Sequence, residues 1–154
     1  SDGLWKAGEF EPEYIIDFAT HTGACDVALG HEATGVRSND DDFRTKIHEA
    51  GNAVDELAWP MPLLPAFEKE MTDSKIADTR NLGAGRWGGA NTAAAFLKQF
   101  VPNRNYDEDG EQITWAHMDI AGTYWGAKTN TMVGNGATGI HVRTMYHLIT
   151  NWNN

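Results

Sequence analysis

Two stretches of the sequence have the hydrophobic pattern of buried β-strands. Residues 14–18 read Tyr-Ile-Ile-Asp-Phe, and residues 113–121 alternate between the two faces of an extended chain. Both stretches change abruptly to small residues, and after the first of them several are hydroxylated. We expect the two strands to lie in one sheet. Ligands bind beyond the carboxyl ends of strands in open α/β sheets, so residues 20–23 and 121–124 should meet at one edge.

Apolar positions spaced three and four residues apart predict helices between these strands. The clearest helix covers residues 40–57, with Asn39 as its expected cap and an apolar stripe of Phe43, Ile47, Ala50, Val54 and Leu57. Further helices are expected at residues 65–71, 91–100 and 139–150, the last with Val142, Met145 and Ile149 on one face. Residues 33–36 suit a short strand, 75–82 a strand or extended segment, and 26–30 a turn. The pattern predicts a three-layer α/β fold whose mixed, mostly parallel sheet is flanked by helices.

Composition and charge narrow the class of protein. The 154 residues, 41% of them hydrophobic, suit one domain, residues 1–154, with one core. The 22 acidic and 12 basic residues give a net charge of −10. That charge opposes binding to nucleic acid and to anionic membranes, so we expect neither partner.

The single cysteine, Cys25, excludes an intrachain disulfide and a cysteine-rich zinc site. No apolar run approaches the roughly 20 residues that span a bilayer, and the N-terminus lacks the pattern of a secretory signal. These features favour a reduced, cytoplasmic setting.

The sequence lacks the usual catalytic motifs. His48-Glu49 has no second histidine one helical turn later, as a zincin would need, and Cys25 has no signature of a catalytic thiol. The glycines of residues 83–89 resemble an anion cradle before a helix, but close helix packing explains them as well. His117 and Asp119 face the same side of a strand, so they either share a cation or satisfy each other in the core.

Five segments together resemble the leucine aminopeptidase (cytosol aminopeptidase) family. They occur in family order and extend over nearly the whole chain. They are Ala-Thr-His-Thr-Gly-Ala (19–24), Trp-Pro-Met-Pro-Leu (59–63), Asn-Thr-Ala-Ala-Ala-Phe-Leu (91–97), Trp-Ala-His-Met-Asp-Ile-Ala-Gly (115–122) and Gly-Ala-Thr-Gly (136–139).

The resemblance implies part of a two-metal aminopeptidase that hydrolyses N-terminal residues from peptides and assembles into hexamers. Its two divalent ions, zinc or manganese, are held in Val-Gly-Lys-Gly, Phe-Asp-Ser-Gly-Gly and Asn-Thr-Asp-Ala-Glu-Gly-Arg segments, and the last carries the catalytic arginine. None of these segments occurs in this sequence. The chain therefore resembles the C-terminal half of the family's catalytic domain. We expect it to contain no catalytic residue and no metal ligand, and to bind no metal ion alone.

The resemblance also implies substrate-binding positions. The loop that matches Thr20, His21, Thr22 and Gly23 offers backbone groups to the peptide in this family. Leu82, Ala121 and Tyr124 match positions that line the pocket for the N-terminal side chain. His21 replaces the usual leucine, which changes the polarity of the pocket, and Tyr124 is bulkier than the common residues at its position.

Three functions remain open on the sequence. The first is an aminopeptidase whose missing half comes from a longer parent chain or a companion fragment. The second is a non-catalytic structural or binding protein that retains the fold. A zinc hydrolase built on the chain's own histidines is the third.

Overall fold

The centre of the fold is a mixed sheet with the strand order β1-β4-β2-β3. The computed structural model describes residues 1–126 and 135–153, and the strands in that part are β1 (Tyr14–Ala19), β2 (Thr34–Ser38), β3 (Ala58–Pro60) and β4 (Thr114–Asp119). β1 is parallel to β4 and β3 is parallel to β2, whereas β4 and β2 are antiparallel. The prediction that the first and last of these strands share a sheet is confirmed, since they are direct neighbours.

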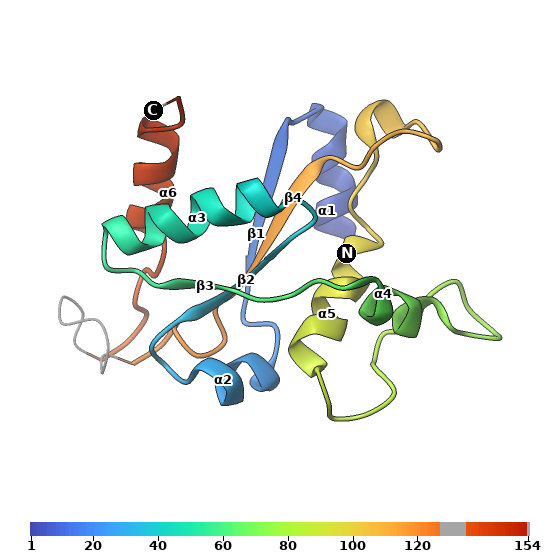
Figure 1. Cartoon of the computed structure of the whole chain (residues 1–154), viewed down its shortest axis with the longest axis horizontal. Helices are drawn as coiled ribbons and strands as arrows, with labels where there is room; N and C mark the ends of the chain where they lie inside the picture. The colour runs from blue at the N-terminus through green and yellow to red at the C-terminus, as the bar shows by residue number, and fades with distance from the viewer. Residues whose placement is uncertain (127–134, 154) are drawn as a thin grey trace.

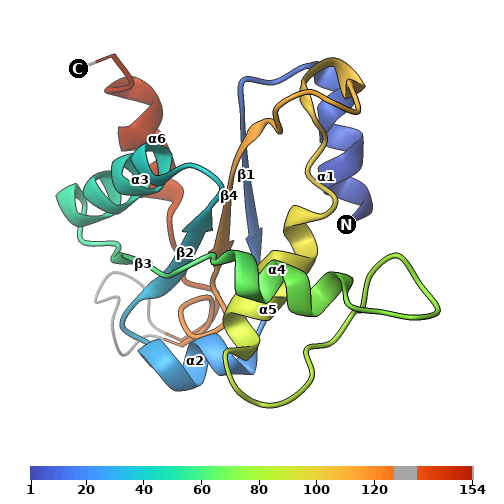
Figure 2. The same ribbon diagram turned by 45° about the vertical axis from the view of Figure 1, so that its right-hand side comes forward.

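Helices cover both faces of the sheet and give three layers (Figures 1 and 2). The helices are α1 (Asp2–Ala7), α2 (Gly23–Leu29), α3 (Asp41–Ala53), α4 (Pro65–Thr72), α5 (Gly89–Lys98) and α6 (Val142–Thr150), with short 3-10 turns at Gly8–Phe10 and Arg104–Tyr106. On one face, α3 and α6 enclose a core around Val36, Ile47 and Met118. On the other, α1 and α5 enclose a core around Leu97 and Trp115. The predicted three-layer α/β fold is confirmed.

Several predicted details are wrong for local reasons. Residues 26–30 belong largely to a helix, α2, because the Thr22 hydroxyl caps it by accepting from the Cys25 amide at 3.0 Å. The cap of α3 is Asp40, whose carboxylate accepts from the Phe43 amide at 2.7 Å. Residues 75–82 form bends and no strand.

Two predicted helix faces also need correction. In the α3 stripe Phe43, Ile47 and Ala50 are buried, but the helix ends at Ala53 and Leu57 is exposed beyond it. In α6 the buried residues are Thr144 and Leu148, whereas Val142 and Ile149 are exposed.

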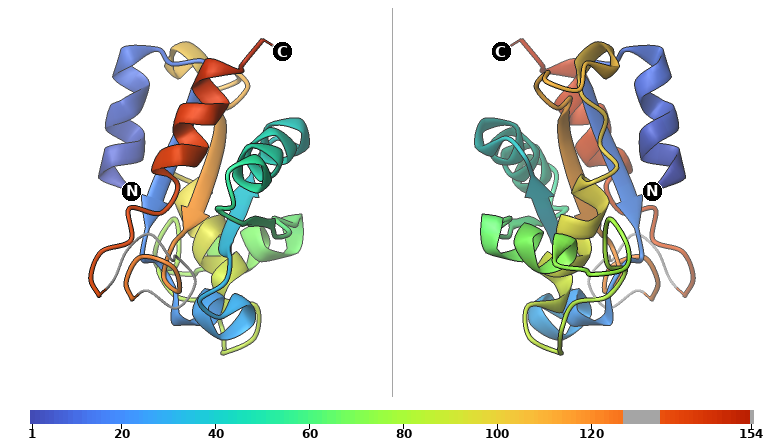
Figure 3. Two further views of the ribbon diagram at one scale, coloured as in Figure 1. Left: turned by 90° about the vertical axis from the view of Figure 1, so that its left-hand side faces the viewer. Right: turned by 90° about the vertical axis from the view of Figure 1, so that its right-hand side faces the viewer.

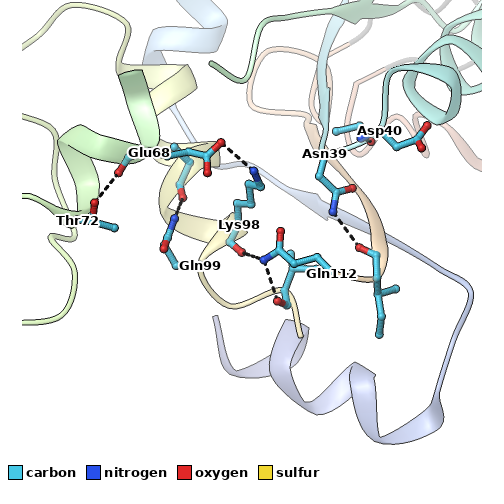
Figure 4. A network of polar contacts seen from close by, with 11 residues as sticks. Asn39, Asp40, Glu68, Thr72, Lys98, Gln99 and Gln112 are labelled. Atoms are coloured by element: carbon cyan, nitrogen blue, oxygen red, sulfur yellow. Dashed lines mark hydrogen bonds and ion pairs between the residues drawn. The ribbon is translucent and has the colours of Figure 1, made fainter. Parts of the chain in front are cut away.

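Side-chain hydrogen bonds hold the α4–α5 layer and the start of β4 in place (Figure 4). Lys98 Nζ on α5 lies 2.8 Å from Glu68 Oε1 on α4. Gln112 donates to the Lys98 and Val101 carbonyls, both at 3.1 Å. Asn39 donates to the Ile113 carbonyl at 2.9 Å and accepts from the Trp115 amide at 2.7 Å. Asn39 therefore binds the backbone at the start of β4 and does not cap α3.

The carboxyl ends of β1 and β4 lie at one edge of the sheet, beside α2 (Figure 3). Their register aligns Asp17 with His117 and Ala19 with Asp119. No helix among the described residues is long and apolar enough to cross a membrane.

Candidate functional site

Asp119 joins the two segments that the sequence predicted to meet. This carboxylate, only 1% exposed, ends β4 and accepts at Oδ1 from the His21 amide at 3.1 Å and the Ala121 amide at 3.2 Å. Its Oδ2 accepts from the Thr22 hydroxyl at 2.7 Å. Residues 20–23 and 121–124 therefore lie at the same edge, because one buried side chain orients both.

The loop after β1 leaves open space at its last residue. Gly23 begins α2, and a Cβ built on it meets no atom within 4 Å. The residue lines a groove of about 370 Å³ between α2 and the start of α5, with Met61 and Trp87 among the other lining residues. Thr20 is exposed beside it, so this part of the loop is accessible to a ligand.

The turn after β4 packs tightly against the end of α2. A Cβ on Gly122 would meet the Gly30 carbonyl oxygen, and the Gly122 carbonyl lies 2.8 Å from His31 Nδ1. On the outer side of this turn Ala121 is half-buried and Tyr124 is 45% exposed. The turn thus has a rigid inner side and an accessible outer side.

Leu82, the remaining residue of the predicted substrate site, is highly exposed. It belongs to the connection between α4 and α5, and its side chain is 76% exposed. Its neighbour Gly83 faces Glu70 on α4 and Thr92 on α5. Among the described residues, no hydrogen bond joins Leu82 to Asp119 or to the two segments that Asp119 orients.

A chain of polar side chains extends from the loop after β1 into the sheet. His21 Nδ1 lies 3.1 Å from His117 Nε2, and His117 Nδ1 lies 2.7 Å from Asp17 Oδ1. The other Asp17 oxygen accepts from Trp115 Nε1 at 2.7 Å. Burial lowers the pKa of His21, and the adjacent His117 lowers it further, so its imidazole is neutral at pH 7. Sequence analysis missed Asp17, whose only signal was a carboxylate within an apolar strand.

Arg37 places a buried positive charge next to His117, its partner in the register between β2 and β4. It is fully buried on β2 and donates to Asn91 Oδ1 at 2.9 Å and to Met61 Sδ. Its Nη1 group has no hydrogen-bond partner among the described residues. Cys25 lies nearby and is also buried. Burial raises the pKa of the Cys25 thiol, with a further contribution from Asp119 and an opposing one from Arg37. A buried thiol of raised pKa is a poor nucleophile, which agrees with its lack of a catalytic signature.

The described residues do not form a two-metal hydrolase site. In that part of the chain, one group of side chains could hold a metal ion, namely His21, His117 and Asp119. Paired catalytic ions lie roughly 3.5–4 Å apart and need carboxylates that bridge or hold each ion. This group has a single carboxylate, so it suits at most one ion. The two residues that the sequence paired, His117 and Asp119, do not satisfy each other, because each has its own partners.

The fold and the polar edge define an α/β domain of the kind that binds ligands beyond the carboxyl ends of its strands. Comparison with protein families makes this class specific, since residues 1–146 match the model of the cytosol aminopeptidase family, catalytic domain. The chain belongs to this family, and the resemblance found in the sequence is confirmed. The family consists of metal-dependent aminopeptidases.

Curated relatives agree with this assignment. The chain is 45% identical over 149 residues to a "Probable cytosol aminopeptidase" of Syntrophotalea carbinolica. The matched segment covers 97% of this chain and 28% of that protein. It is 46% identical over 149 residues to a protein of the same name from Streptomyces avermitilis, covering 96% of this chain and 27% of the relative. The chain thus spans little more than a quarter of the length of these relatives.

Proposed function

We propose that this chain forms the substrate-binding part of an aminopeptidase that removes N-terminal residues from peptides. The observation that carries the proposal is the family match over residues 1–146. The common attachment of residues 20–23 and 121–124 to Asp119 supports it, since the family resemblance assigns both segments to the substrate.

The chain's own residues would bind and orient the peptide. Gly23 leaves room for a peptide backbone to approach the start of α2, where free amides favour the carbonyl oxygens of a substrate. Ala121 and Tyr124 would limit the space for the N-terminal side chain, and the exposed Leu82 would line the same pocket. His21 would act through its backbone, because its ring contacts His117.

The two divalent ions and the catalytic arginine would come from segments outside this chain. Together the ions would polarise the peptide carbonyl and activate a water molecule. In this proposal the complete enzyme is a cytoplasmic hexamer that contains zinc or manganese. The names of the relatives support the cytosolic setting.

A segment exchange tests the proposal. The 154-residue chain would replace the matching 149-residue segment of the Syntrophotalea carbinolica relative. With added manganese or zinc, we expect the hybrid to hydrolyse leucine amide and the isolated chain to be inactive. The unmodified relative is the positive control.

Two outcomes would count against the proposal. A hybrid that folds and assembles like the active relative but hydrolyses no amide would favour the non-catalytic alternative. Turnover by the isolated chain, persisting after removal of host peptidases, would show that the chemistry does not need residues from outside.

A further inference from the structure

Three side chains with metal-binding atoms converge at the carboxyl ends of β1 and β4. They are His21, which is half-buried, and His117 and Asp119, which are buried. One ligand atom from each lies within 4.8 Å of the other two. The group is thus reachable from solvent on the His21 side and enclosed by protein on the other.

The hydrogen bond of His117 to Asp17 directs the free nitrogen of the ring toward His21. His117 Nδ1 donates to Asp17 Oδ1 at 2.7 Å, so Nε2 carries a lone pair and faces His21 Nδ1. Asp17 is itself fixed by the indole of Trp115. A histidine held by a carboxylate at its second nitrogen is the usual arrangement around a metal ligand.

Asp119 is oriented in a comparable way. Its oxygens accept from the His21 and Ala121 amides and from the Thr22 hydroxyl. The Thr22 amide also donates to Oδ1, so three donors occupy that oxygen, whereas Oδ2 accepts only from the Thr22 hydroxyl. A carboxylate oxygen has more than one acceptor position, so Oδ2 is the atom with room for a cation contact. The His21 amide donates to Asp119. The loop that carries His21 is therefore already held next to the Asp119 carboxylate.

The distance between the two imidazoles suits a shared ion. Zn–N bonds of about 2.0–2.1 Å at a tetrahedral angle place two nitrogens about 3.3 Å apart. Here His21 Nδ1 and His117 Nε2 are 3.1 Å apart, and their rings are nearly perpendicular, at 88°. A simple hydrogen bond between the rings needs a proton on His21 Nδ1. Binding of a cation at His21 Nδ1 needs a lone pair on that nitrogen, so the proton of the neutral His21 ring must then be on Nε2.

The surrounding charges also favour a cation. Asp17 and Asp119 contribute two negative charges, and the buried Arg37, paired in register with His117, contributes one positive charge. The sum is one net negative charge. Imidazole nitrogens favour zinc, copper, nickel and cobalt ions over magnesium and calcium.

We propose that His21, His117 and Asp119 together bind one divalent transition-metal ion, such as Zn²⁺. The site differs from the two-metal site implied by the family and does not depend on the proposed peptidase function. It departs from the sequence-based expectation that this chain alone binds no metal ion.

Titration of the metal-free 154-residue chain with Zn²⁺ tests the proposal. We expect one high-affinity ion per chain, with no competition from Mg²⁺. His21→Leu removes the most accessible ligand, so Zn²⁺ affinity should fall about tenfold or more. The matched control is His147→Asn at a half-buried histidine of α6 that is not part of the site, where affinity should stay within about twofold. Equal affinity in His21→Leu and the unmodified chain, or no stoichiometric binding, would overturn the proposal.

Nuclear magnetic resonance of the histidine rings keeps the test valid should a variant fail to fold. In the unmodified chain, one equivalent of Zn²⁺ should shift the ring nitrogen resonances of His21 and His117 and leave those of His147 in place. Shifts confined to histidines other than His21 and His117 would show adventitious binding and contradict the site.

Discussion

His141 should make the stability of the fold depend on pH. The side chain is 1% exposed and precedes α6 with a φ of 66°. Its Nδ1 lies 3.0 Å from the Thr144 hydroxyl, and that hydroxyl lies 2.7 Å from Glu56 Oε2. A carboxylate only accepts, so the hydroxyl donates to Glu56 and must accept from His141 Nδ1. His141 Nε2 then carries a buried lone pair, and it has no hydrogen-bond partner among residues 1–126 and 135–153.

A second proton on this ring would find no acceptor in the part of the chain that the structure describes. Burial lowers the pKa of His141 from 6.5 to about 4, and the attraction of Glu56 opposes the shift only in part. In the unfolded chain the ring takes up its proton near 6.5, so the unfolded state binds more protons between these values. The free energy of unfolding is therefore unaffected by His141 above pH 6.5 and decreases as the pH falls through this window. A difference of 2.5 pKa units corresponds to about 3 kcal/mol.

The variant His141→Asn isolates this contribution. Asparagine tolerates a left-handed backbone and does not titrate, so the difference between the pH profiles of the two proteins reports the imidazole of His141. Urea unfolding, followed by tryptophan fluorescence, would give both free energies of unfolding from above pH 6.5 down to about 4. We expect the unmodified chain to lose about 3 kcal/mol relative to the variant over this range. Parallel pH profiles for the two proteins would refute the reasoning.

Two substitutions test the packing beneath the site. Arg37→Met should raise the free energy of unfolding by about 2 kcal/mol in urea titrations, because it removes a buried charge that forms no ion pair with a carboxylate of the described residues. A clear loss of stability would mean that the guanidinium has a compensating partner. Gly122→Ala should lower the melting temperature and cost about 1–3 kcal/mol, because its Cβ would meet the Gly30 carbonyl. An unchanged melting curve would show that the turn after β4 can move away from α2.

The main strands could be predicted because both have a local apolar pattern, although burial follows that pattern in β4 and not in β1, where Ile15 is buried but Tyr14 and Phe18 are exposed. β1 and β4 are apolar runs that end in small residues, and their adjacency follows from parallel packing. β3 could not be recognised, because it has three residues and ends at Pro60. α2 was interpreted as a turn because its only buried residue is Cys25, which leaves little periodicity to detect.

The meeting of residues 20–23 and 121–124 was predictable, but the contacts that hold them were not. Asp119 binds the His21 amide across 98 positions, and His117 reaches Asp17 across 100. Such pairs depend on the register between β1 and β4, in which Asp17 lies opposite His117. That register cannot be inferred from the pattern of apolar and polar residues within either strand. The sequence placed His117 and Asp119 on one face of a strand but did not reveal His21 as their neighbour.

Gly23→Val in the segment-exchange hybrid tests most directly whether this edge of the sheet binds the peptide. The added side chain meets no atom of this chain within 4 Å, so it should fill space that only a substrate would need. Gly3→Val is the matched control, because Gly3 also lies in the first turn of a helix and is equally open. We expect kcat/KM for leucine amide to fall roughly tenfold or more in Gly23→Val. The control should stay within about twofold. Equal kcat/KM in the two variants, with fold and assembly intact, would contradict the placement of the substrate at this loop.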